Sequence, residues 1–123
     1  MSTRAQHTVL IVEDELLLRM ELANELVAAG WNVREAASGE EAILTMEGES
    51  TIDFLVTDIR LGGKADGWDV ADKFRERHPD GLVIYVSANP DLAHRRVAGS
   101  VFMSKPVVID ALLATCDKLV LKS

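Results

Sequence analysis

Short apolar runs alternate along the chain with longer stretches in which apolar residues recur every three or four positions. The apolar runs are residues 9–12, 31–35, 54–56, 82–86 and 101–103. Val9–Val12 is continuously apolar and rich in β-branched residues, which is typical of a strand buried on both faces. Residues 31–35 alternate between apolar and polar positions, which favours a strand nearer the edge of a sheet. The pattern predicts five strands.

Five helical patterns follow these strands. In the first, the predicted inward stripe is Leu16, Met20, Ala23 and Val27, widened by Leu22 and Leu26, and Gly30 ends the helix. The second begins at Ser38 with a capping box completed by Glu41. The others are predicted as a helix ending before Pro79, a short helix over 91–97, and a last helix with Ile109, Leu112, Cys116 and Leu119 on one face.

Strands that alternate with helices through short loops predict an α/β fold, a doubly wound five-stranded parallel sheet with helices on both faces. Ligands bind such sheets beyond the carboxyl ends of the strands. Those positions carry polar side chains: Glu13 and Asp14 after the first run, Asp58 after the third, Ser87 after the fourth and Lys105 after the fifth. We therefore expect these five side chains to converge.

Such a group is suited to phosphoryl chemistry. Adjacent carboxylates repel each other and require a cation or a raised pKa, and a few oxygen ligands at an open site suit Mg²⁺. A carboxylate beside the metal can act as a nucleophile toward phosphorus. Lys105 and Ser87 would then donate to the phosphoryl oxygens.

Composition narrows the possible functions. The chain has 123 residues, which predicts one domain over 1–123. Its 13 basic and 20 acidic residues give a net charge of −7, which argues against binding of nucleic acid or an anionic membrane. Cys116 is the single cysteine, so no internal disulfide can form. The apolar run 9–12 is too short for a signal peptide or membrane span, so we expect a cytoplasmic protein.

The strand-end residues resemble the phosphorylation site of the receiver domain of two-component response regulators, over about 8–121. The resemblance implies strand order 2-1-3-4-5 and phosphorylation of Asp58 by a histidine kinase or phosphotransfer protein. It also implies Mg²⁺ held by Glu13, Asp14, Asp58 and the backbone carbonyl of Arg60, and phosphoryl binding by Ser87 and Lys105. A switch involving Ser87 and Phe102 is implied, with a cis peptide before Pro106.

A receiver of this kind is expected to catalyse only its own phosphorylation and dephosphorylation, to act as a monomer or weak homodimer, and to signal through a separate output protein of unknown identity. We expect a stand-alone receiver, although a piece of a hybrid kinase is an alternative.

Three features depart from the family pattern. The loop after Asp58 has glycine at position 62, where most members have proline, and is one residue longer, which predicts greater mobility. Lys105 stands 18 positions after Ser87, about one helical turn less than usual, so the fourth helix should be short or partly unwound. The acidic pair is Glu-Asp, so Glu13 could reach the metal directly or through a water.

Three alternative functions remain open. A phosphatase of the haloacid-dehalogenase type also uses an Asp nucleophile, but its second acid would stand at the position of Arg60. A flavodoxin-like cofactor binder would need a phosphate loop where this chain has Glu13-Asp14-Glu15. A pseudo-receiver would signal by binding alone.

Overall fold

The computed structural model describes residues 7–48, 51–89 and 95–122, with the side chains of 119–122 excepted. Its elements, in chain order, are β1 (Thr8–Val12), α1 (Leu16–Ala28), β2 (Asn32–Ala36), α2 (Gly39–Gly48), β3 (Phe54–Asp58), α3 (Gly67–Arg77), β4 (Leu82–Ser87), β5 (Val101–Ser104) and α4 (Ile109–Lys122). The five strands lie where the apolar runs predict them, with β2 displaced by one residue toward the C-terminus.

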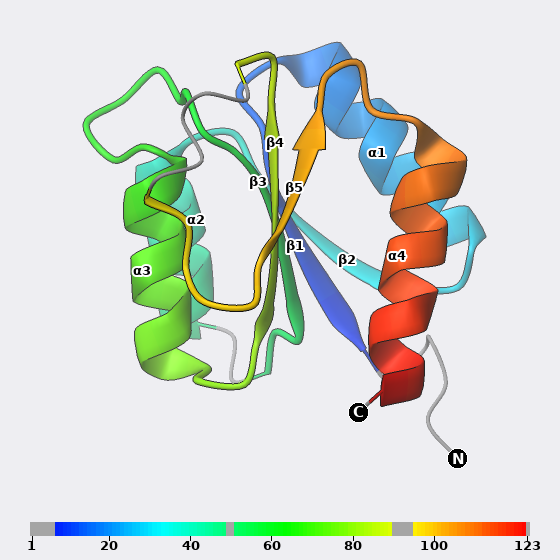
Figure 1. Ribbon diagram of the computed structural model, residues 1–123. Helices are drawn as coiled ribbons and strands as arrows, with labels where there is room; N and C mark the ends of the chain where they lie inside the picture. Colours follow the sequence, from blue (N-terminus) through cyan, green and yellow to red (C-terminus); the bar gives the residue numbers. More distant parts are fainter. Residues whose placement is uncertain (1–6, 49–50, 90–94, 123) are drawn as a thin grey trace.

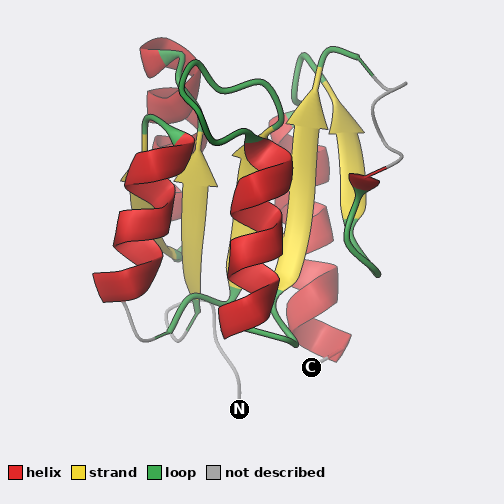
Figure 2. Ribbon diagram, turned by 90° about the vertical axis from the view of Figure 1, so that its left-hand side faces the viewer, coloured by secondary structure: helices red, strands yellow, loops and turns green. Residues whose placement is uncertain are grey.

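The strands form one parallel sheet in the order β2-β1-β3-β4-β5, which confirms the expected fold class and strand order. Helices α1 and α4 cover one face of the sheet and α2 and α3 cover the other (Figure 1). Figure 2 shows α2 and α3 in front of the sheet, with all arrowheads at the same edge. Every strand therefore delivers its last residue to that edge.

Each face of the sheet has its own hydrophobic core. Leu10 and Leu55 point toward α2 and α3, whereas Val9 and Val56 point toward α1 and α4. Because side chains alternate along a strand, the central strands must be apolar at every position to fill both layers. The continuous runs in the sequence reflect this arrangement. Among the described helices, none is both long and apolar enough to cross a membrane.

The predicted inward stripe of α1 was right for Ala23, Leu22 and Leu26 and wrong for Leu16, Met20 and Val27. Leu16, Met20 and Val27 are 56%, 46% and 57% exposed. The helix buries Leu22, Ala23 and Leu26, and Leu18 is partly buried on the same side. Apolar residues surround the first turns of this helix, so their spacing does not define a single face.

Two helix starts depend on side-chain caps. The backbone N–H of Glu41 donates to the Ser38 hydroxyl oxygen at 3.1 Å, as the capping box at the start of α2 predicts. Helix α3 has a reciprocal capping box that the sequence reasoning did not identify. There Asp66 and Asp69 each accept a hydrogen bond from the other's backbone N–H, at 3.0 Å. This cap fixes the end of the loop that follows Asp58.

The connection from β4 to β5 lacks an α-helix in its described part. Residues 91–94 of the helix predicted over 91–97 lie outside the described residues, and 95–97 contain no α-helix. Val97 donates its backbone N–H to the Tyr85 hydroxyl oxygen at 3.0 Å. Arg95 lies over the Trp68 ring and pairs with Asp72 at 3.5 Å. These contacts hold the described end of the connection against β4 and α3.

Candidate functional site

The acidic pair follows β1 directly, and the backbone around Glu13 is held on both sides. The Glu13 N–H donates to the Ala36 carbonyl oxygen on β2 at 3.1 Å. Its carbonyl oxygen accepts from Nη1 of Arg19 at 2.9 Å. The Glu13 side chain is buried and accepts from the Glu15 N–H at 3.1 Å, whereas Asp14 is exposed. The pair thus presents one buried and one open carboxylate.

Asp58 ends β3 at the same edge and is 8% exposed. Its backbone carbonyl oxygen accepts a hydrogen bond from the buried Thr57 hydroxyl at 2.8 Å. Gly67, at the start of α3, packs so closely against that carbonyl that a β-carbon there would overlap it. The Asp58 backbone is therefore fixed from two sides. Its position at the end of β3 then determines the direction in which its carboxylate points.

Lys105 follows β5 and bridges two of the acids. Its Nζ lies 2.9 Å from Oδ2 of Asp58 and 3.0 Å from Oε1 of Glu13. Burial lowers the pKa of the Lys105 ammonium, but hydrogen bonds and charge interactions with Asp58 and Glu13 outweigh burial and raise that pKa overall. Lys105 is consequently a fixed positive charge at neutral pH.

The pKa of Glu13 is also raised. Burial is the main cause and the negative charge of Asp58 adds to it, while the Glu15 N–H and Lys105 act in the opposite direction. A raised pKa in the folded state means that stability is lost as the pH rises through that pKa and Glu13 ionises. Burial thus disfavours the ionised form of Glu13, and a bound cation would favour that form.

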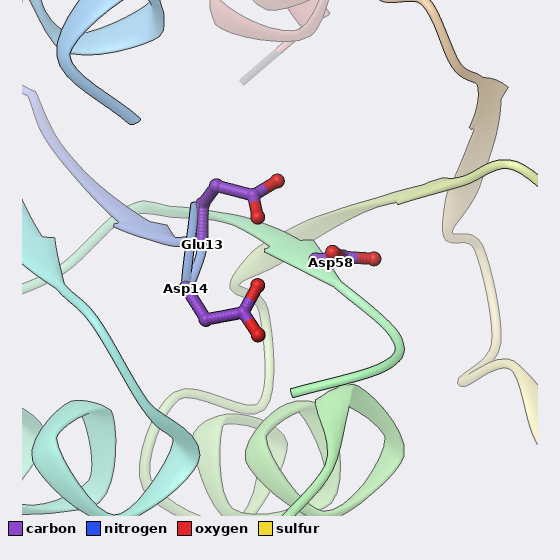
Figure 3. A group of neighbouring side chains, drawn as sticks. All are labelled: Glu13, Asp14 and Asp58. Atoms are coloured by element: carbon purple, nitrogen blue, oxygen red, sulfur yellow. The ribbon is translucent and has the colours of Figure 1, made fainter. Parts of the chain in front are cut away.

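The donor set fits Mg²⁺. Carboxylate oxygens of Glu13, Asp14 and Asp58 all lie within 4.8 Å of one another (Figure 3). Hard oxygen ligands in this number, with one open side, suit an ion that keeps several waters. Within the described part of the chain, the Asp14 carboxylate has no hydrogen bond or ion pair. Its oxygens are thus available to a metal without breaking an existing contact.

A small cavity adjoins Asp58. It has a volume of about 140 Å³ and is lined by Asp58, Arg60, Ser87, Ala88, Asn89 and Lys105. Ser87 ends β4 and is buried, and its hydroxyl oxygen accepts from the Asn89 N–H at 3.0 Å. The Ser87 carbonyl oxygen accepts from the Lys105 N–H at 2.9 Å, which joins the ends of β4 and β5. The cavity is large enough for a phosphoryl group.

The remaining predicted residues lie on or beside β5. The Lys105–Pro106 peptide bond is cis, the form that the resemblance implied. Phe102 is half-buried, and its ring centroid lies 6.2 Å from that of the buried Tyr85. The Tyr85 ring also packs against Trp68 in a tilted arrangement, with 4.9 Å between the ring centroids. The structure therefore brings all five strand-end side chains to one edge, and an aromatic cluster lies behind Ser87.

Two contributors were missed by the sequence reasoning. Arg19 holds the Glu13 backbone, and Tyr85 links β4 to the following connection. A signal for Arg19 exists, since it is the one charged residue in the otherwise apolar segment 16–20. The Cys116 thiol is buried, as expected, and burial raises its pKa to about 12.

Comparisons with a family model, with curated proteins and with solved structures all point to the same family. The model of the response regulator receiver domain matches residues 9–117. The chain is 36% identical over 122 residues to the sensor kinase CckA of Brucella abortus, covering 94% of this chain and 13% of that protein. It is 33% identical to a cyclic di-GMP phosphodiesterase of Thermotoga maritima, covering 85% of this chain and 28% of that protein. The chain thus spans a small part of these curated relatives.

Solved structures agree with the sequence matches. A response regulator receiver protein from Sinorhizobium medicae is 31% identical, with a TM-score of 0.87 over 93% of this chain and 94% of that one. The receiver domain of the hybrid histidine kinase CckA is 32% identical, with a TM-score of 0.78 over 92% of this chain and 98% of that one. These proteins share the doubly wound fold described above.

Proposed function

This chain belongs to the response regulator receiver domain family of two-component signalling, and we propose that Asp58 is its phosphoryl-accepting residue. The observation that carries the proposal is the bridge made by Lys105, which contacts Asp58 and Glu13 at 2.9 and 3.0 Å. Asp58 and Lys105 both line the small cavity, so a carboxylate that could attack phosphorus lies beside an ammonium that could stabilise the phosphoryl oxygens.

Glu13, Asp14, Asp58 and the backbone carbonyl of Arg60 would hold Mg²⁺. Bound there, Mg²⁺ would neutralise negative charge on Asp58 and on the incoming phosphoryl oxygens. Without that neutralisation, Glu13 and Asp14 would repel the phosphoryl group. Two observations support this assignment: the three carboxylates lie within 4.8 Å of one another, and the Asp14 carboxylate has no partner among the described residues.

In the proposed step, a carboxylate oxygen of Asp58 attacks the phosphorus of a phosphohistidine donor. A new O–P bond forms while the P–N bond breaks, and its electron pair returns to the donor imidazole. Lys105 would move its hydrogen bond from the carboxylate to a phosphoryl oxygen, and the Ser87 hydroxyl would donate to another. The chain would later hydrolyse the same acyl phosphate, so its chemistry stays confined to its own phosphorylation and dephosphorylation.

Ser87 and Phe102 would couple phosphorylation to a change at the surface. The Ser87 hydroxyl oxygen accepts a hydrogen bond from the Asn89 N–H at 3.0 Å. If the hydroxyl turns toward the phosphoryl group, that hydrogen bond breaks. Phe102 lies on the neighbouring strand β5, directly opposite Tyr85 in the strand register. Its contact with Tyr85 gives such a movement a route to the connection between β4 and β5.

Receiver domains interact with histidine kinases or phosphotransfer proteins, and we propose one of these as the phosphoryl donor. The output partner, a monomeric or weakly dimeric state and a cytoplasmic location remain predictions. The haloacid-dehalogenase alternative is not supported, because the position two residues after Asp58, where that family has its second acid, is Arg60, and Arg60 lines the cavity.

Chemical trapping tests the identity of the acceptor. After incubation with acetyl phosphate and Mg²⁺, borohydride reduction converts an aspartyl phosphate to homoserine, which peptide mass mapping locates. We expect conversion at Asp58 alone, and none in protein reduced without the phosphodonor. Conversion at Glu13 or Asp14 with Asp58 intact would overturn the assignment.

A further inference from the structure

Arg19 of α1 lies behind the acidic pair, outside the phosphoryl cavity. Its Nη1 donates to the Glu13 carbonyl oxygen at 2.9 Å, and its Nε lies 3.3 Å from Oε1 of Glu35 on β2. The Arg19 side chain is 15% exposed. One guanidinium therefore joins the start of the β1–α1 connection, helix α1 and the edge strand β2.

The contact with Glu13 determines the direction of the Glu13–Asp14 peptide. The Glu13 N–H is already held by the Ala36 carbonyl of β2, so Arg19 fixes the other side of the same residue. A guanidinium can make both contacts at once because its N–H groups are arranged in a rigid planar fork. Glu35 in turn keeps the fork oriented toward the carbonyl.

Asp14 depends on this backbone more than the other two acids do. Lys105 holds the carboxylates of Glu13 and Asp58 directly. Within the described residues, no side chain or N–H holds the Asp14 carboxylate, and Asp14 is exposed. The position of its oxygens in the metal-binding group is thus set by the peptide that Arg19 orients.

We propose that Arg19 is a positioning residue for the Mg²⁺ site, acting through the Glu13 carbonyl and supported by Glu35. The inference rests on the proposed function, since it requires that Glu13, Asp14 and Asp58 bind Mg²⁺. Residues that orient metal ligands affect affinity although they do not touch the metal. Arg19 is positively charged, as Mg²⁺ is, so its charge alone would disfavour metal binding.

This sign makes the proposal testable. If Arg19 acted only through its charge, its removal would strengthen Mg²⁺ binding, because a nearby like charge would be lost. If Arg19 positions the ligands, its removal weakens binding in spite of that gain. For Arg19→Gln we expect the Mg²⁺ dissociation constant to rise about 10-fold.

The affinity is measured by titrating Mg²⁺ into the isotope-labelled chain and following the backbone amide NMR signals of Glu13, Asp14 and Asp58. Arg19→Lys keeps the charge and one donor but not the planar fork, so it should restore part of the affinity. Lys73→Gln removes an equal charge from the exposed surface of α3 and should leave the affinity unchanged. Denaturant unfolding of each metal-free variant verifies that it is folded.

Mg²⁺ binding to Arg19→Gln that is as tight as, or tighter than, binding to the wild type would overturn the positioning role while leaving the proposed function intact. If Mg²⁺ binding were weakened equally in Arg19→Lys and Arg19→Gln, a single donor to the Glu13 carbonyl would restore no affinity. That result would contradict the role proposed for this contact. Absence of Mg²⁺-dependent shifts in the wild type itself would overturn the proposed function together with this inference.

Discussion

Replacement of Lys105 by methionine is expected to slow phosphorylation of Asp58 by acetyl phosphate about 100-fold, because loss of one donor to a developing oxyanion has effects of this size. The ammonium lies 2.9 Å from Oδ2 of Asp58, where it can transfer its hydrogen bond to a phosphoryl oxygen. Methionine preserves much of the side-chain length without the charge. The rate is followed as the fraction of phosphorylated protein by intact mass.

The same substitution should strengthen Mg²⁺ binding. Lys105 competes with the cation for Glu13 and Asp58, and removal of this like charge frees both carboxylates. A slower reaction with tighter metal binding would separate phosphoryl stabilisation from metal binding. Lys118→Met, on the exposed side of α4, is the matched control and should alter neither quantity. A Lys105→Met variant that is phosphorylated at the wild-type rate would contradict the role given to this lysine.

Gly67→Ala is expected to destabilise the fold by about 2 kcal/mol, the usual range for an extra methyl group in a tightly packed position. The added β-carbon would overlap the Asp58 carbonyl oxygen and crowd the Cα of Ile59. Backbone atoms cannot turn aside as a flexible side chain can, so the junction of β3 and α3 must shift. Denaturant unfolding measures the free energy, and slower phosphorylation should accompany the loss because Asp58 moves.

Gly48→Ala is the control for this substitution. Gly48 ends α2, and a β-carbon there would meet no heavy atom within 4 Å. Alanine also restricts the unfolded chain more than glycine does, so stability should stay the same or rise by about 0.5 kcal/mol. Equal stability of Gly67→Ala and the wild type would show that the contact with Asp58 is looser than the structure indicates.

Much of this architecture was predictable because parallel sheets impose simple constraints. Central strands buried on both faces must be continuously apolar, which identified β1, β3 and β4 from the sequence. Parallel strands deliver their carboxyl ends to one edge, so the order of strands and polar residues along the chain was enough to predict that Glu13, Asp58 and Lys105 meet.

Periodicity was less informative where apolar residues exceeded what one helix face can bury. Helix α1 begins with three leucines, and the exposed Leu17 shows that an apolar residue can face solvent as readily as the core. The face of α1 that turned inward depended on packing against β1 and α4. The spacing of apolar residues within the helix cannot predict that packing. The same limit applies to β2, where the buried Trp31 precedes the strand that it was expected to begin.

Contacts between distant residues were the least predictable. Arg19 meets Glu35 only because β2 lies beside β1, and Tyr85 meets Val97 only because the connection after β4 folds back over the strand. The loop after Asp58 was expected to be mobile, yet it is tied at Ala65, whose N–H donates to Oε1 of Glu40 at 2.8 Å. Its mobility remains a prediction that this contact opposes.

The central claim is that Asp58 accepts a phosphoryl group with the help of Mg²⁺, and intact mass spectrometry tests it most directly. Wild-type protein and Asp58→Asn are incubated with acetyl phosphate, each with Mg²⁺ and with a chelator in its place. We predict a single phosphoryl adduct that forms only in the wild type and only with Mg²⁺. An adduct of equal yield in Asp58→Asn, or none in the wild type with Mg²⁺, would contradict the claim, and the second result would favour a receiver that signals by binding alone.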